Sequence, residues 1–393
     1  MRILFTSTAG SGHFNPLVPF IDAVTAGGGE VLVVAPPDLE PAPAGRGYPY
    51  RLGANPAKEE ADEIWRRFPT VPKNEAAVLA NREFFGRLCT AAMLPTVEEV
   101  CREWKPDLIL RDPCEFSSAV AGARLGIPHA QVAISLADVE WSSIGLAEAA
   151  IEQYGGQVVR QLRDSPYLTR FPATLDPSPF PDIRRFRDSV DASPGQPLPD
   201  WWNGSEDPLV YLTFGSVTGG RSVGTAAFRA AAEAVRGLPV RALLTIGRDG
   251  EASALGPLPD NVHVEQWVPQ ANVLGQAAAL VCHGGSGTTF GALAAGVPMV
   301  FVPLFADQPV NARLVSAAGA GVTVAPSGGP EGAMGVPGPE DPARIRAALQ
   351  SVLDDDSYRA AAKGIAAEMA TMPSIADLLA GLTADLVPSA QKP

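Results

Sequence analysis

The sequence predicts an α/β protein made of two doubly wound, parallel-sheet domains that face each other across a cleft. Short strand-like runs of apolar residues alternate with helix-like segments, which is typical of parallel sheets covered by helices on both faces. The alternation occurs twice, before and after a proline-rich stretch at about residues 171–207 that we expect to be an interdomain linker. The length of 393 residues favours about two to three domains.

Composition narrows the class of protein further. Asp and Glu outnumber Lys and Arg by 43 to 30, a net charge of −13, which argues against nucleic acid or an anionic membrane as partner. The longest apolar run, residues 293–306, contains two prolines and is too short to span a bilayer. The first ten residues hold too short an apolar stretch for a signal peptide. No CxxC pair occurs among the four cysteines, so we expect neither a zinc site nor a disulfide framework. We therefore expect a cytoplasmic protein.

The individual elements follow the same pattern. Residues 3–8 and 31–35 predict strands, and Asn15 predicts the N-cap of the helix between them. We expect strands also at residues 107–112 and 126–134, and helices over about 55–100 and at 116–125. The segment from about 135 to 170 has the character of an insertion that shapes a binding site.

The segment 281–308, VCHGGSGTTFGALAAGVPMVFVPLFADQ, carries the clearest chemical signal. A strand ends at Cys282, and a glycine-rich stretch leads directly into a helix. Glycines permit close backbone approach, and a helix N-terminus attracts a phosphate-type anion. The candidate anion-binding residues are His283, Gly285, Ser286, Gly287 and Thr288. The alternative is an ordinary glycine-rich turn.

Further candidates flank this segment. Trp267 follows a strand and could stack on a base, while Val268 offers backbone groups to the edge of that base; alternatively, Trp267 is a packing residue. Asp307 and Gln308 follow another strand and could bind sugar hydroxyls; alternatively, they cap the next helix.

Residues 266–308 resemble the donor-binding signature of GT-B glycosyltransferases that use nucleotide sugars, and TAGSGHFNP is similar to their acceptor-side motif. The whole chain resembles the bacterial natural-product branch, which includes the calicheamicin, urdamycin and macrolide glycosyltransferases. The resemblance implies the GT-B fold, with an acceptor domain at 1–200 and a donor domain at 206–375. It also implies that residues 376–393 cross back to the N-terminal domain. Ser216 matches the family's second phosphate-contacting loop.

The resemblance also assigns the catalytic residues. It makes His13 the base that takes a proton from the acceptor hydroxyl, and Asp112 the carboxylate that supports it. An imidazole suits this task at neutral pH. Two of the other three histidines, His129 and His263, lie in strand-like runs and are expected to serve structure. Asp112 could instead cap the helix that follows it.

The chemistry implied is an inverting displacement in which a hydroxyl of a hydrophobic small-molecule aglycone attacks the anomeric carbon. No acidic DxD-like cluster lies near the donor signature, so we expect neither a metal nor a bound cofactor. Gly291 stands where plant relatives carry a glutamate for the ribose hydroxyls. We therefore expect a dTDP-(deoxy)sugar donor in antibiotic biosynthesis. Homodimer formation stays open.

The acceptor side is less specific. Trp65, Phe68, Phe84, Phe85 and Trp141 could line an apolar acceptor pocket or belong to the core. The sequence leaves open C-glycosyl transfer, use of a UDP-sugar, and a non-catalytic nucleotide-sugar-binding accessory protein. A transferase of lipid-linked precursors is disfavoured by the acidic charge. A dinucleotide-dependent dehydrogenase is disfavoured because the GxGxxG pattern is incomplete. No acid that could bind ribose is evident at the end of the second predicted strand, where Asp38 is the nearest candidate.

Overall fold

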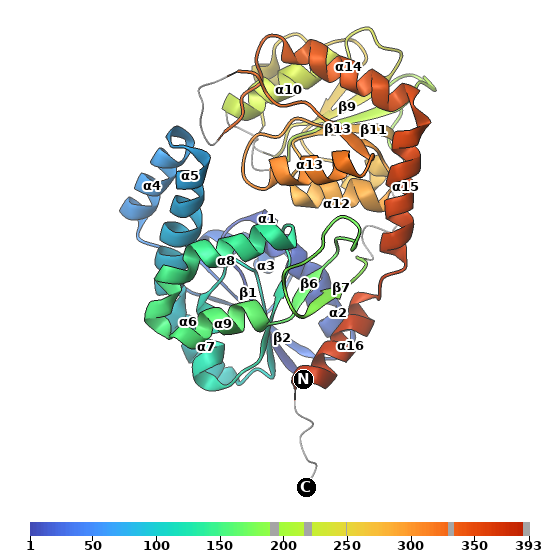
Figure 1. The fold of residues 1–393 in the computed structure, drawn as a ribbon. Coiled ribbons are helices and arrows are strands. Elements are labelled where there is room, and N and C mark those ends of the chain that lie inside the picture. Colours follow the sequence, from blue (N-terminus) through green and yellow to red (C-terminus); the bar gives the residue numbers. More distant parts are fainter. Residues whose placement is uncertain (189–195, 216–221, 249, 329–333, 388–393) are drawn as a thin grey trace. The chain divides into compact units, whose positions relative to one another are not determined.

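The computed structural model describes residues 1–188, 196–215, 222–248, 250–328 and 334–387. The chain divides into two compact units, one formed by Met1–Asp188 with Met372–Pro393 and the other by Ser189–Thr371. Each unit holds one parallel sheet with helices on both of its faces (Figure 1), which confirms the predicted fold class. In the described part of the chain, no helix is both long enough and apolar enough to cross a membrane.

The sheet of the first unit has seven parallel strands in the order β3-β2-β1-β4-β5-β6-β7. Their bounds are β1 Arg2–Thr6, β2 Glu30–Ala35, β3 Tyr50–Leu52, β4 Leu108–Arg111, β5 His129–Val132, β6 Tyr167–Thr169 and β7 Ile183–Arg185. The central strands β1 and β4 are neighbours, and Thr6 pairs with Arg111. Because parallel strands end at the same edge of a sheet, the loops that follow β1 and β4 begin side by side.

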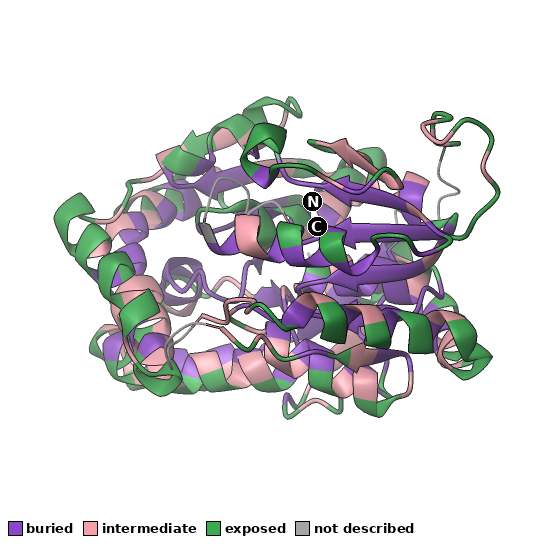
Figure 2. Ribbon diagram, turned by 90° about the horizontal axis from the view of Figure 1, so that it is seen from above, coloured by how far each residue is buried: buried purple, intermediate pink, exposed green. Residues whose placement is uncertain are grey.

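Successive residues of β1 pack on opposite faces of this sheet, as the period of a strand requires. Ile3 and Phe5 join a core cluster that also contains Phe20 of α2 (Val18–Ala26), and Leu4 joins a cluster on the other face. Helix α16 (Ile375–Leu386) packs into the first cluster beside α2. The C-terminal segment therefore belongs to the first unit. Figure 2 shows buried strands beneath helices whose outer faces are exposed.

Four longer helical segments, with the short 3-10 segment η3 (Phe68–Thr70) between the first two, follow one another in the region predicted to be helical. They are α4 (Lys58–Arg67), α5 (Lys73–Val78), the π-helical segment η4 (Leu79–Cys89) and α6 (Thr90–Trp104). Segment η4 packs closely on α8 (Ala137–Ile151), and Gly86 permits this approach. A Cβ at Gly86 would lie 3.2 Å from Ala147 Cβ and 3.3 Å from Ala150 Cβ. The π-helical winding was not anticipated from the sequence.

Three expectations need correction. Helical structure begins at α1 (Ser11–Phe14), not at an N-cap at Asn15, and continues through the 3-10 segment η1 (Asn15–Leu17) into α2. The region 135–170 is no insertion, since α8, α9 (Gly156–Asp164) and β6 are integral to the first unit. Residues 171–188 are not linker, because β7 extends the sheet and apolar side chains of this stretch join the core. The buried ones are Phe171, Leu175, Phe180 and Phe186.

The sheet of the second unit has six parallel strands in the order β10-β9-β8-β11-β12-β13. Their bounds are β8 Leu209–Thr213, β9 Arg241–Thr245, β10 Val262–Glu265, β11 Ala277–Cys282, β12 Met299–Phe301 and β13 Gly321–Thr323. Helices lie on both faces of this sheet (Figure 1). They are α10 Ser222–Ala234, α11 Gln270–Leu274, α12 Ser286–Ala294, α13 Gln308–Ala317, α14 Asp341–Asp354 and α15 Asp356–Ala370. The glycine-rich stretch follows β11, a central strand.

Candidate active site

A histidine and an aspartate lie together at the carboxyl edge of the first sheet. His13 stands on α1, and Asp112 directly follows β4. Nδ1 of His13 lies 3.0 Å from each carboxylate oxygen of Asp112. When a neutral imidazole carries its proton on Nδ1, its basic lone pair is on Nε2. The structure thus brings the two predicted residues into hydrogen-bond contact, in an arrangement that can take up a proton.

The Asp112 carboxylate is fully buried and surrounded by hydrogen-bond donors. Its Oδ2 accepts from the backbone N–H of Thr8 at 3.1 Å and from the Thr8 hydroxyl at 2.6 Å, and its Oδ1 accepts from Cys114 N at 3.0 Å. Burial raises the pKa of a carboxyl, but His13 and these hydrogen bonds outweigh it and hold the pKa of Asp112 below its ordinary value. An ionised Asp112 can orient the imidazole and stabilise its protonated form.

Arg111, the last residue of β4, ties the loop that carries Asp112 to the sheet. Its Nη1 donates to the carbonyl oxygens of Asp112, Pro113 and Glu115 at 3.2, 3.1 and 3.3 Å. Its Nη2 donates to Gln131 Oε1 at 3.0 Å. Burial lowers the pKa of Arg111 to about 10, so the group remains a cation at neutral pH. Sequence reasoning missed Arg111, although a cation inside an otherwise apolar strand was a usable signal.

His283 is the central side chain of the glycine-rich stretch in the second unit. It is buried, and a Cβ added at Gly285 or Gly215 would lie only 2.5 or 2.8 Å from its Nε2. Glycine at both positions therefore makes room for the ring. Burial lowers the pKa of His283 to about 4, and its Nδ1 has no hydrogen-bond partner within the described residues. A neutral imidazole with an unsatisfied nitrogen beside a helix N-terminus can donate to an anion.

A hydrogen-bonded group joins α12 to α13. Ser286 Oγ donates to Asp307 Oδ2 at 2.6 Å, and Asn311 Nδ2 donates to the same oxygen at 3.0 Å and to Gly284 O at 2.8 Å. Because the Ser286 hydroxyl points into this group, its backbone N–H, in the first turn of α12, is what it can offer an anion. Asp307 stands at the N-cap position of α13, where its backbone carbonyl accepts from Val310 N and Asn311 N but its side chain makes no capping hydrogen bond. Asn311 was missed by the sequence analysis.

The remaining predicted donor residues differ in exposure. Gly287 is exposed and Thr288 is half-buried in the first turn of α12. Gln308 is buried, and its Oε1 accepts from Leu304 N at 2.8 Å and Phe305 N at 3.0 Å, so that its carboxamide braces the loop before α13. Ser216 lies outside the described residues.

Trp267 stands two residues after β10 with 54% of its surface exposed. The guanidinium carbon of Arg248 lies 4.8 Å from the centre of its ring, and Val268 beside it is half-buried. An exposed indole of this kind can stack on a planar ligand. Arg248 was not among the sequence candidates.

Gly291 and two histidines are the remaining positions that the sequence analysis names. Gly291 is buried, and a Cβ there would meet Leu274 Cδ1 at 3.2 Å and Gln270 Oε1 at 3.3 Å, so a glutamate could not enter without displacing them. His129 is buried in β5, where burial lowers its pKa to about 3. The ring of His263 stacks on that of Trp201 with the ring centres 4.3 Å apart, and its Nε2 lies 2.8 Å from Glu265 Oε1. Both histidines serve packing.

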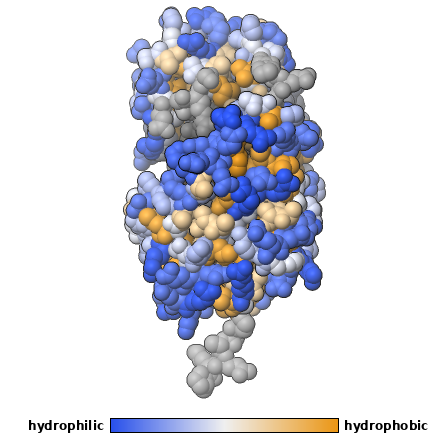
Figure 3. Space-filling view, turned by 90° about the vertical axis from the view of Figure 1, so that its left-hand side faces the viewer, coloured by the Kyte–Doolittle hydropathy of each residue, from blue (hydrophilic) through white to orange (hydrophobic). Residues whose placement is uncertain are grey.

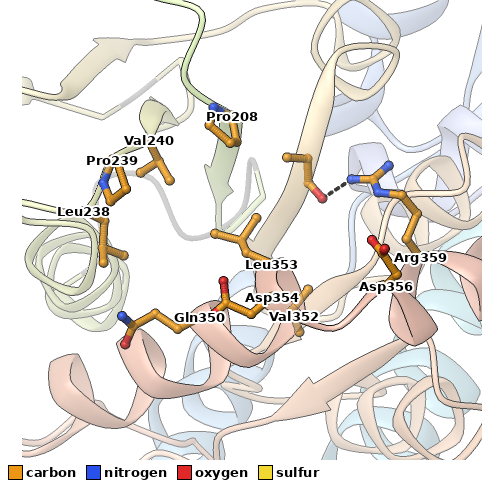
Figure 4. A pocket seen from close by; sticks show the side chains of 11 residues that line it. Pro208, Leu238, Pro239, Val240, Gln350, Val352, Leu353, Asp354, Asp356 and Arg359 are labelled. Atoms are coloured by element: carbon orange, nitrogen blue, oxygen red, sulfur yellow. Dashed lines mark hydrogen bonds between the residues drawn. The ribbon is translucent and has the colours of Figure 1, made fainter.

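A hollow in the second unit lies away from these residues (Figure 4). Pro208 and Val240 line it just before β8 and β9 begin, and Arg359 donates across it to the carbonyl oxygen of Ala278. It therefore opens at the amino ends of the strands, whereas His283 follows a carboxyl end. In such sheets ligands bind beyond the carboxyl ends.

Comparisons with family models match both units. Residues 22–176 match the N-terminal domain of the erythromycin biosynthesis protein CIII-like family, and residues 241–384 match its C-terminal domain. The elloramycin glycosyltransferase ElmGT of Streptomyces olivaceus is 30% identical over 100% of this chain and 99% of its own length. The L-demethylnoviosyl transferase of Streptomyces niveus is 28% identical over 98% of both chains.

Solved structures give the same result. The glycosyltransferase SsfS6 of Streptomyces sp. SF2575, in complex with thymidine diphosphate, is similar with a TM-score of 0.74 and 25% identity, covering 98% of this chain and 99% of its own. The glycosyltransferase SnogD of Streptomyces nogalater is similar with a TM-score of 0.73 and 25% identity, with the same coverage.

Proposed function

This chain belongs to the erythromycin biosynthesis protein CIII-like family of natural-product glycosyltransferases, and from that premise we propose that it transfers a sugar from a dTDP-sugar to a hydroxyl of a hydrophobic small molecule. The observation that carries the proposed chemistry is the 3.0 Å contact between His13 Nδ1 and Asp112. It supplies a histidine base with an ionised partner. A base of this kind contributes about 10²–10⁴-fold to a rate.

The proposed reaction is one displacement with inversion. His13 takes the proton of the acceptor hydroxyl on Nε2, and the hydroxyl oxygen forms a bond to the anomeric carbon. The bond from that carbon to the diphosphate oxygen breaks, and thymidine diphosphate leaves with the electron pair. Asp112 stabilises the imidazolium that results, and it remains ionised throughout.

The donor diphosphate is assigned to the N-terminus of α12. His283 and the backbone N–H groups of Gly285, Ser286, Gly287 and Thr288 would donate to it. The approach of a diphosphate raises the pKa of His283 from its low value, so that the imidazole gains positive charge as the leaving group develops negative charge. Trp267 would stack on the thymine ring, and Asp307 and Gln308 would face the sugar.

Support for a dTDP-sugar comes from Gly291 and from the relatives. Glycine at position 291 supplies no carboxylate that would hold ribose hydroxyls, and a larger side chain there would have to displace Leu274 and Gln270. The similar SsfS6 structure is a complex with thymidine diphosphate. Calorimetry with dTDP and UDP tests this assignment: dTDP should bind more tightly, and tighter binding of UDP would contradict it.

The transfer is proposed to need no metal ion. Within the described residues, one group has ligating atoms close enough to hold an ion: His13, Asp112 and Cys114, whose atoms lie within 4.8 Å of one another. Burial raises the pKa of the Cys114 thiol well above its ordinary value, which disfavours the thiolate that a metal would need. Transfer should therefore persist in EDTA, and loss of transfer that added Mg²⁺ restores would contradict metal independence. The four cysteines are buried and unbonded, in keeping with the proposed cytoplasmic location.

The central experiment separates binding from chemistry. His13→Ala should lower the transfer rate by about 10²–10⁴-fold and leave the dTDP dissociation constant unchanged, because His13 is a base and not a donor ligand. His263→Gln is the control, since this histidine contacts Trp201 and Glu265. The anomeric configuration of the product, read by NMR, should be opposite to that of the donor. Full turnover by His13→Ala would remove His13 from the mechanism.

A further inference from the structure

Four rings in the first unit contact one another in a continuous series that ends at the candidate base, and Phe68 joins its far end, with its ring centre 5.4 Å from that of Trp65. The ring centres of Trp65 and Phe84 are 4.9 Å apart, those of Phe84 and Phe85 are 5.1 Å apart, and those of Phe85 and His13 are 5.4 Å apart. The interplanar angles of 66°, 74° and 49° are those of edge-to-face and tilted pairs, which aromatic rings prefer. We call Trp65, Phe84 and Phe85 the aromatic series.

The series comes from separate elements that other contacts hold in place. Trp65 lies on α4, and Phe84 and Phe85 are consecutive residues of η4. Phe84 packs against the small cluster around Ile64 and Phe85 packs against the main core, and the two rings remain in contact with each other. The close packing of Gly86 on α8 fixes the position of this part of η4.

The exposure of the series is unusual for a core. Trp65 keeps 42% of its surface exposed, and both phenylalanines are only partly buried. Aromatic side chains that serve only packing would gain most from complete burial. Figure 3 shows hydrophobic side chains reaching the surface on the side of the molecule that faces its viewer, bordered by hydrophilic ones. A binding wall explains partly exposed rings better than a core does.

The neighbouring charges favour an uncharged ligand. Arg87 donates to Glu83 at 3.0 Å and to Glu60 at 2.8 Å, and Arg82 donates to Glu83 at 2.7 Å, so two arginines and two glutamates on η4 and α4 neutralise one another. A planar aromatic molecule can stack on or edge against rings set at these angles, whereas a puckered aliphatic ring cannot make the same contacts. The aromatic series ends beside His13, and an acceptor hydroxyl must lie at His13 for proton transfer.

We propose that the aromatic series is an acceptor subsite that selects planar aromatic aglycones, holding the ring system against Trp65, Phe84 and Phe85 with a phenolic hydroxyl at His13. This inference rests on the proposed function and narrows its acceptor to one chemical class. It assigns Trp65 a role in specificity although it does not touch His13.

The test measures acceptor binding by calorimetry on the full chain, without donor, so that its readout is independent of turnover. The probes are a hydroxylated anthraquinone and a saturated macrolactone alcohol. Trp65→Ala should raise the anthraquinone dissociation constant by roughly fivefold to tenfold, the effect of losing one aromatic contact, and should leave the macrolactone value within about twofold. Trp65→Phe should restore most of the anthraquinone affinity.

Two controls keep the result interpretable. Tyr154→Leu removes a partly buried aromatic ring of the same unit that lies beside Arg124, outside the series, and should leave anthraquinone binding unchanged. Circular dichroism shows whether each variant is folded. Unchanged anthraquinone affinity in folded Trp65→Ala, or tighter binding of the macrolactone by the unaltered chain, would overturn the inference while leaving sugar transfer intact. Failure of the proposed function would look different. The unaltered chain would then transfer no sugar, whereas the acceptor dissociation constants would be unaffected.

Discussion

The hydroxyl of Thr8 donates a 2.6 Å hydrogen bond to Oδ2 of Asp112, a carboxylate with no exposure to solvent. Thr8 precedes His13 by five residues, so the motif that carries the base also carries a donor for its partner. The contact connects the loop after β1 to the loop after β4. Thr8 is therefore a positioning residue that acts on His13 through Asp112.

Thr8→Val removes this hydroxyl and keeps the shape of the side chain. Because the hydrogen bond helps to lower the pKa of Asp112, its loss raises that pKa. The stability that a carboxyl with a lowered pKa contributes is present above its unfolded-state pKa and is lost as pH falls through its folded-state pKa. We expect the acidic limb of the transfer rate to move to higher pH, and unfolding to cost about 1.5–3 kcal/mol less.

A pH profile of kcat/KM and urea unfolding at pH 7 check this prediction. Thr8→Ser keeps a hydroxyl and should restore most of both properties. A Thr8→Val protein with an unaltered acidic limb would show that the hydroxyl does not set the ionisation of Asp112.

Gly285→Ala should weaken donor binding. The new Cβ would lie 2.5 Å from His283 Nε2, a distance at which the ring must move away from its position beside α12. We expect the dTDP dissociation constant from calorimetry to rise at least tenfold, about 1.4 kcal/mol. Gly364→Ala on α15 is the matched control, since nothing lies within 4 Å of its new Cβ and dTDP affinity should not change. Equal dTDP affinities in the two variants would show that His283 does not contact the diphosphate.

Trp267 and Arg248 offer a test of base binding. Trp267→Ala should weaken dTDP binding by about 1–3 kcal/mol, the usual value of one base–aromatic stack. Arg248→Ala should weaken dTDP binding by about 0.5–1 kcal/mol, because it keeps the indole of Trp267 and removes only the guanidinium that lies 4.8 Å from the centre of that ring. Trp202→Phe alters a tryptophan that packs near Arg241 and serves as control. Should Trp267→Ala bind dTDP normally, the base lies elsewhere.

Acid should destabilise the second unit more than the first. Burial lowers the pKa of His283 from 6.5 to about 4. Between these pH values the imidazole is protonated in the unfolded chain but stays neutral in the folded unit. Stability is therefore lost as pH falls from 6.5 to 4, by about 3 kcal/mol in total. In the first unit, His129 acts in the same direction, but burial raises the pKa of Asp176 to about 6, which adds stability as pH falls from 6 to 3.8.

Urea unfolding at pH 7 and pH 5, followed by limited proteolysis and mass spectrometry, assigns the loss to one unit or the other. Cleavage within residues 222–371 should appear at lower urea at pH 5 than at pH 7, with a smaller change for residues 1–188. Equal shifts in both units would contradict the assignment to His283.

Much of the site could be predicted from the sequence because its residues stand where chain geometry is simple. His13, Asp112 and the stretch from His283 to Thr288 all follow apolar runs that form central parallel strands, and such strands end at one edge of a sheet. Only the order of strands and loops was needed to group them within each unit. The family resemblance added their roles.

Tertiary packing decided the rest. The buried position of Arg111, the contact of Arg248 with Trp267 and the room that Gly215 gives to His283 all depend on residues far apart in the chain, and no local pattern records such contacts. Residues 171–188 lack periodicity because prolines interrupt them, yet their side chains complete the core. Local sequence determined which segments become strands and where each ends, since that depends on runs of apolar side chains. Only the folded structure decided which polar groups meet, because their partners come from distant segments that the sheet brings together.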